Sequence, residues 1–173
     1  MTGGRPTLTS HVVDPISTGG SIVYRKNDVR LRVGSTTLPP QRRAYRASVV
    51  VEPDGADSVS LVLRASNDQS EHTEIRYDTA AHRLSVDRTR SGDVLFGPLF
   101  PSVSSATVPL QNGRLTLDVY VDSSSVEVFA QDGQYCVTNL VYPKPSSTGM
   151  TVVSRGGRAM LRELTVTAYP ATR

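Results

Sequence analysis

The chain has 173 residues, and a chain of this length can form one domain that buries roughly 70% of its unfolded surface. Its only cysteine, Cys136, excludes an internal disulfide, and no Cys/His cluster has the spacing of metal ligands. We therefore predict a domain held together by its apolar core, with no metal and no cofactor.

The charge pattern also limits the partners. Nineteen basic and 16 acidic residues are interspersed and leave a net charge of +3. The densest basic group, Arg42, Arg43 and Arg46, fits a solvated strand edge better than a nucleic-acid footprint, which is usually denser. No apolar run approaches the ~20 residues of a membrane span. We expect neither a nucleic-acid nor a membrane partner.

The first residues, MTGGRPT, lack the apolar middle region of a signal peptide. We expect residues 1–10 to be a flexible leader and residues 11–173 to form a single β-sandwich domain. No composition shift divides that stretch further.

Apolar and polar residues alternate in short runs, which is typical of half-buried strands. Pairs such as Asn112-Gly113 and Asp132-Gly133 suit tight hairpin turns, whereas residues 36–41, with two prolines, predict a loop. No stretch sustains an apolar helical period; one short helical turn near residues 78–81 is less favoured than a hairpin loop. The predicted strands are Ser21–Arg25, Val29–Val33, Tyr45–Val51, Ser58–Ala65, Ile75–Tyr77, Leu84–Val86, Leu115–Val121, Val126–Phe129, Val137–Tyr142 and Leu161–Ala168.

Many short strands separated by turns favour an all-β fold, a β-sandwich of two antiparallel sheets. Two of the predicted hairpins place polar side chains at alternate positions. The first offers Glu74 and Asp87, and the second offers Asp122 and Glu127. If these lie on the outer surface of adjacent strands, they form one polar face. Carboxylates and a guanidinium suit a neutral, polyhydroxylated ligand. The alternative is that they are the ordinary solvent side of a half-buried sheet, with surface pairs worth under ~1 kcal/mol.

Catalysis has weaker support in the residues. Glycoside hydrolysis normally uses two carboxyl groups, and the four carboxylates of the polar face are enough by number. No recognisable apolar pocket surrounds one of them, however. There is no G-x-S-x-G motif, and Cys136 falls in an apolar predicted strand. Tyr77 is expected in the core and His82 in an exposed turn.

Three segments are more specific than this pattern. They are EIRYDTAAHRLSVDRTRSGDV, DVYVDSSSVEVFAQDG and TNLVYPKPSSTGM. In this order and spacing they resemble the C-terminal β-sandwich of glycoside hydrolase family 32, the family of invertases, inulinases and levanases. They are also similar to carbohydrate-binding module family 66. The resemblance covers roughly Ser58 to Tyr169, and the part of the chain up to about Ser48 resembles nothing specific.

The resemblance implies a concanavalin-like sandwich without catalytic residues. In such enzymes the catalytic Asp lies in an Asn-Asp-Pro motif of a preceding five-bladed propeller. This chain has Val13-Asp14-Pro15 instead, and Tyr135 stands where the Glu of the family's Glu-Cys pair would precede Cys136. We therefore expect no enzyme activity from the chain itself.

Two roles remain open. As a binding module, the domain would hold the terminal fructose of a levan- or inulin-type fructan. As a companion domain, it would pack on a family 32 catalytic propeller and add stability. The family's polymeric substrates imply an extracellular location. The expected ligand-binding residues of the first role are Glu74, Asp87, Arg88, Ser91, Asp122, Glu127 and Gln134.

Overall fold

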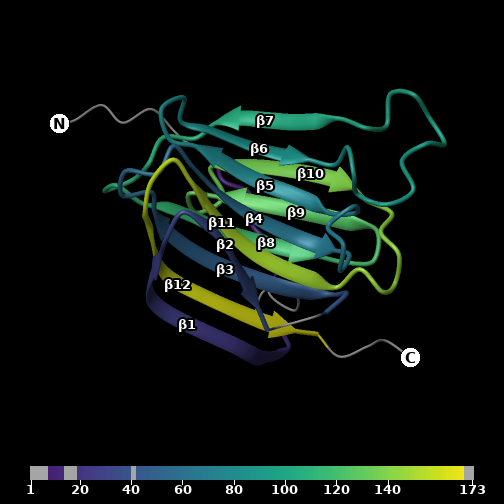
Figure 1. Ribbon diagram of the computed structural model, residues 1–173, viewed down its shortest axis with the longest axis horizontal. Coiled ribbons are helices and arrows are strands. Elements are labelled where there is room, and N and C mark those ends of the chain that lie inside the picture. The colour runs from purple at the N-terminus through teal and green to yellow at the C-terminus, as the bar shows by residue number, and fades with distance from the viewer. Residues whose placement is uncertain (1–7, 14–18, 40–41, 170–173) are drawn as a thin grey trace.

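The computed structural model describes residues 8–13, 19–39 and 42–169, and these residues form two antiparallel six-stranded sheets packed face to face (Figure 1). Sheet A has the order β1 (Ser21–Leu31), β12 (Ala159–Ala168), β3 (Tyr45–Glu52), β8 (Leu115–Val121), β9 (Ser125–Ala130) and β10 (Tyr135–Leu140). Sheet B has the order β2 (Gly34–Leu38), β11 (Gly149–Arg155), β4 (Ser58–Ala65), β5 (Thr73–Asp78), β6 (Arg83–Asp87) and β7 (Val103–Thr107). The predicted all-β sandwich is confirmed.

The core lies between the sheets and consists mainly of valine and leucine. Alternation places the apolar side chains of each hairpin inward: Leu117 and Val119 of β8 face the core, as do Ile75 of β5 and Val86 of β6. Burying one such side chain fully stabilises the fold by about 1.5–3 kcal/mol. Tyr77 is buried as predicted, at 1% exposure.

The structure differs from the predicted strands in four places. The two predicted strands near the start form one strand, β1, and the predicted loop at 36–41 overlaps β2, which ends at Leu38. Strands β7 and β11 were not predicted. The sequence of β7, VSSAT, is too short and polar for a clear signal, while the buried run within β11 does not alternate. Both acquire their structure by pairing with a neighbouring strand.

Two smaller expectations have mixed outcomes. His82 lies exposed in the β5–β6 turn, as predicted, with a φ of 48°. Cys136, by contrast, is exposed on β10, because the inward positions of that strand are Val137 and Asn139. The predicted leader falls partly outside the described residues; within them, the Ser10 N–H donates to the Gly133 carbonyl at 2.8 Å. The described residues include no helix long and apolar enough to cross a membrane.

A buried arginine connects the two sheets at one end of the sandwich. Arg64, at the end of β4, is 1% exposed and has a φ of 51°. Its guanidinium donates to four backbone carbonyls: Ser147 and Arg43 at 2.8 Å, and Asp122 and Lys144 at 3.4 Å. Burial lowers the pKa of this guanidinium. These carbonyls belong to three separate loops, so one side chain fixes their relative positions.

We expect Arg64→Ala to destabilise the domain by about 3 kcal/mol, because several carbonyls lose a charged donor and each such bond is worth about 1.5–3 kcal/mol. Urea unfolding followed by circular dichroism measures the change. Arg76→Ala is the matched control, since Arg76 is exposed on the outer face of sheet B. An Arg64 variant as stable as the control would contradict this role.

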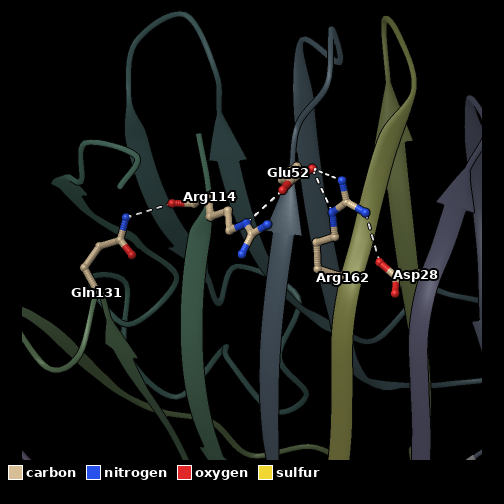
Figure 2. A network of polar contacts seen from close by, with 5 residues as sticks. All are labelled: Asp28, Glu52, Arg114, Gln131 and Arg162. Carbon is tan, nitrogen blue, oxygen red and sulfur yellow. Dashed lines mark hydrogen bonds and ion pairs between the residues drawn. The ribbon is translucent and has the colours of Figure 1, made fainter. Parts of the chain in front are cut away.

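At the opposite end of sheet A, an ion-pair network joins four strands or their flanks (Figure 2). Glu52 of β3 accepts from Arg114 at 2.8 Å and from Arg162 of β12, whose guanidinium also contacts Asp28 of β1 at 2.9 Å. The side-chain bonds from Arg162 and Arg114 lower the pKa of the Glu52 carboxyl. Gln131 continues the network by donating to the Arg114 carbonyl at 3.1 Å.

Candidate functional site

The seven predicted site residues do not form one face. Glu74 and Asp87 lie opposite each other on adjacent strands of sheet B, whereas Asp122 and Glu127 belong to sheet A. The expectation of a single polar face on adjacent strands is therefore wrong. Sequence alternation assigned each side chain an inner or outer direction, but it did not say to which sheet each hairpin belongs.

Gln134 is farthest from the others, because it lies in the β9–β10 turn at the end of the sandwich where residues 112–113 also turn. Asp122 lies at the other end, in the β8–β9 turn, where its Oδ1 accepts from the Ser123 N–H at 2.6 Å. Glu127 projects from the outer side of β9, and its carboxylate makes no hydrogen bond or ion pair with the residues that the structure describes.

Glu74 has a structural partner. Arg155 of β11 donates from Nη1 to Glu74 Oε1 at 2.9 Å and to Ser60 Oγ at 2.7 Å. The Glu74 side chain is 18% exposed. It thus crosses the outer face of sheet B to hold neighbouring strands together, and a ligand would have to compete with Arg155 for it.

The run Asp87-Arg88-Thr89-x-Ser91-Gly92 is a compact turn after β6. Asp87 Oδ1 accepts from the Thr89 N–H at 2.8 Å and from Thr89 Oγ1 at 2.7 Å. The Ser91 N–H donates to the Arg88 carbonyl at 3.2 Å. Ser91 is fully buried, which removes it as a direct ligand contact. Asx and Ser/Thr bonds of this kind stabilise turns locally.

Gly92 explains why the run ends in glycine. Its φ is 108°, and a Cβ there would collide with the Tyr142 carbonyl oxygen. The same carbonyl accepts from the Asp93 N–H at 3.0 Å, and the Tyr142 N–H donates to Ser91 at 3.0 Å. The turn after β6 is in this way attached to the segment that follows β10, and so to sheet A.

Arg88 points away from this turn toward a group of aromatic rings that the sequence analysis missed. Its Nε donates to Ser102 Oγ at 2.8 Å, and its guanidinium carbon lies 4.2 Å from the centre of the Phe100 ring. Phe96 lies 4.6 Å from Phe100, and Tyr142 lies 5.4 Å from both, measured between ring centres. Arg88, Phe96, Phe100 and Tyr142 are called the Arg88 cluster below.

The aromatic rings of the Arg88 cluster come largely from residues 94–102, here called the apolar loop. Phe96 is 62% exposed and Tyr142 40%, while Leu95 and Leu99 are 90% and 89% exposed. The sequence signal was the run VLFGPLFP, which is apolar yet contains the Gly-Pro pair of a loop. An apolar run that cannot be a core strand indicates an exposed contact surface.

The described residues contain no group of three or more His, Cys, Asp or Glu side chains able to hold a metal ion. The arrangement at the Arg88 cluster supports binding through hydrogen bonds and ring contacts. Arg88 supplies charged donors, and the rings of Phe96 and Tyr142 supply apolar faces near it.

Comparison with known proteins agrees with the sandwich. The family model described as glycosyl hydrolases family 32 C terminal matches residues 17–168. The chain belongs to glycoside hydrolase family 32, as its C-terminal domain. The family match starts well before Ser58, so the upstream strands, for which the sequence analysis found no resemblance, are part of it.

Several similar proteins are named for the fructans that they act on. A levanase of Bacillus subtilis is 34% identical over 122 residues, which are 69% of this chain and 18% of the levanase. An extracellular exo-inulinase of Aspergillus niger is 35% identical over 137 residues, or 78% of this chain and 26% of that protein. The solved exo-inulinase of Aspergillus awamori superposes with a TM-score of 0.91 at 27% identity, covering 99% of this chain and 34% of that one. The chain thus spans only about a fifth to a third of these relatives.

We expect Gly92→Ala to detach the turn after β6 from Tyr142, because the new methyl group would meet backbone rather than a movable side chain. Gly113→Ala is the control: Gly113 also has a positive φ, 75°, but a Cβ there meets nothing within 4 Å. Both variants carry the backbone strain, of order 1 kcal/mol. Only Gly92→Ala should also speed hydrogen exchange of the Tyr142 and Asp93 amides; equal exchange in both variants would contradict the assignment.

Proposed function

We propose that the domain is a non-catalytic accessory part of an extracellular fructan-hydrolysing enzyme and that it binds the terminal fructosyl unit of a levan- or inulin-type chain. The relatives named as levanase and extracellular exo-inulinase support the substrate class and the location. The observation that carries the binding role is the Arg88 cluster: a guanidinium stacked on Phe100, with exposed rings of Phe96 and Tyr142 beside it.

Sugars present both hydroxyl groups and apolar C–H faces, and the Arg88 cluster offers partners for both. Arginine carries five N–H donors; in Arg88, Ser102 Oγ engages the one on Nε and the Leu140 carbonyl engages one on Nη1 at 3.5 Å. Asp87 uses Oδ1 in its turn, and its Oδ2 makes no hydrogen bond with the residues that the structure describes. Neither Glu74 nor Glu127 belongs to this surface: Glu74 is paired with Arg155, and Glu127 lies on sheet A. We therefore narrow the proposed site to Asp87, Arg88, Phe96 and Tyr142.

Calorimetric titration with levan and inulin oligosaccharides tests the proposal. A site near 100 μM corresponds to about −5.5 kcal/mol. Arg88→Ala and Phe96→Ala should each weaken binding about tenfold, which is about 1.4 kcal/mol. Arg76→Ala, on the outer face of the same sheet, should bind normally. Phe96 is largely exposed, so its variant should keep the unfolding temperature. Absence of saturable binding by the parent chain would refute the sugar-binding role.

A second candidate function has its own observation. Leu95 and Leu99 are almost fully exposed, and a sugar beside Arg88 does not explain two leucines in water. An exposed apolar loop instead suits a protein contact, as expected for a companion domain that packs on a catalytic propeller. The small share of each relative that the chain covers is consistent with such a neighbour.

Pull-down with a separately produced family 32 catalytic domain distinguishes the two functions. If the apolar loop is the contact, the chain should retain the catalytic domain, and the double variant Leu95→Ser/Leu99→Ser should lose at least nine-tenths of it. The same variant should still bind fructan if the Arg88 cluster is the sugar site. Retention by the double variant at the parent level would exclude the apolar loop as the contact.

A further inference from the structure

A separate hollow lies on the outer face of sheet A, away from the Arg88 cluster. It has a volume of about 210 Å³. Its floor consists of outward side chains of β3, β8 and β9, and one wall is the segment Ser10–Val12. None of the seven predicted site residues lines it, although Glu127 lies directly opposite Tyr120 in the β8–β9 pairing, at its border.

The wall is held by a close backbone contact. The Ser10 N–H donates to the Gly133 carbonyl at 2.8 Å, and a Cβ at Gly133 would collide with the Ser10 carbonyl. Gly133 thus permits the segment to lie against the β9–β10 turn. Ser10 and Gly133, which border the hollow together, are more than a hundred residues apart in the chain.

The floor of the hollow contains an ion pair whose two charges cancel. Arg46 donates from Nε and Nη2 to the two carboxylate oxygens of Asp118, both at 2.7 Å, and each side chain is 28% exposed. The Tyr120 hydroxyl contacts Asp118 Oδ2 at 3.4 Å. Burial raises the pKa of Tyr120 to about 12, so this hydroxyl stays protonated at neutral pH. The Arg46–Asp118 pair cancels its own charge, and the remaining lining adds one carboxylate, Asp132, and one imidazole, His11. No cluster of like charge therefore selects an ion at this floor, which suits a neutral polar ligand.

The same floor has an apolar part and additional hydroxyls. The rings of Tyr120 and Phe129 meet edge to face with centres 5.8 Å apart. Ser48 and Thr116 contribute hydroxyl groups that both donate and accept. Each carboxylate oxygen of Asp118 accepts one bond from Arg46 and retains further acceptor capacity. Acceptors, hydroxyls and ring faces together match the mixed surface of a sugar.

We propose that this hollow is a binding site for one neutral polyol ring, such as a monosaccharide or the single end unit of an oligosaccharide. A volume of 210 Å³ is below the range of about 300–1,000 Å³ that is usual for drug-sized ligands, which limits the occupant to one ring. Asp118, oriented by Arg46, accepts hydrogen bonds from the hydroxyls, and Phe129 with Tyr120 contacts the C–H face. The site is independent of the Arg88 cluster and does not require it.

Two-dimensional amide NMR with added fructose tests the proposal, with glycerol as a flexible polyol and acetate as an anion. A dozen heavy atoms on a half-open surface give affinities in about the millimolar range. Fructose should produce saturable shifts at the residues that line the hollow. Glycerol should bind at least tenfold more weakly, and acetate should give no shift there. A response to acetate alone would overturn the ligand class.

Variants distinguish a true site from a general sugar effect. Thr116→Tyr fills the hollow from an exposed strand position, and it should abolish the fructose shifts without lowering the unfolding temperature. Asp118→Asn should weaken binding about tenfold. Phe96→Ala, at the Arg88 cluster, should leave the hollow's response unchanged. Fructose shifts that survive Thr116→Tyr, shifts confined to the Arg88 cluster, or no saturable shift would each overturn the proposal.

Discussion

The end of the sandwich that carries the Arg88 cluster depends on the buried guanidinium of Arg64. A buried cation is costly unless its hydrogen bonds are satisfied, and here four backbone carbonyls satisfy them. Two of the acceptors flank strands of sheet A and two lie in the loop before β11 of sheet B. An uncharged side chain of similar size could not replace these bonds. The guanidinium therefore fixes the spacing of the two sheets at the end where the loops are longest.

Hydrogen bonds connect the motif after β6 to that fixed end. The Lys144 N–H, in the loop held by Arg64, donates to Glu71 Oε1 at 2.7 Å, and the His72 N–H donates to the Arg90 carbonyl at 2.7 Å. The loops that follow β4, β6 and β10 are thus cross-connected by hydrogen bonds. The Arg88 side chain extends from these connected loops, and its guanidinium already lies over the Phe100 ring. A ligand would lose little conformational entropy in ordering it.

The sandwich also separates its two candidate surfaces physically. The Arg88 cluster lies at an end of the molecule, next to the apolar loop, whereas the hollow lies on the outer face of sheet A beneath the segment that precedes β1. Ligand binding at one surface can therefore be tested, and refuted, independently of ligand binding at the other.

Alternation and turn chemistry are local properties, so the amino-acid sequence was enough to predict most of the strands, their inward faces, the turns at Asn112-Gly113 and Asp132-Gly133, and the family. The motif from Asp87 to Gly92 was also visible, although its main role is a turn. Only the tertiary structure decided which hairpin joins which sheet: the pairing of β8 with β3 and of β5 with β4 places Glu127 and Glu74 on different sheets. It also decided that Glu74 meets Arg155 and that Phe96, Phe100 and Tyr142 gather around Arg88. These contacts join residues far apart in the chain, and no local pattern encodes which distant partner a side chain will meet.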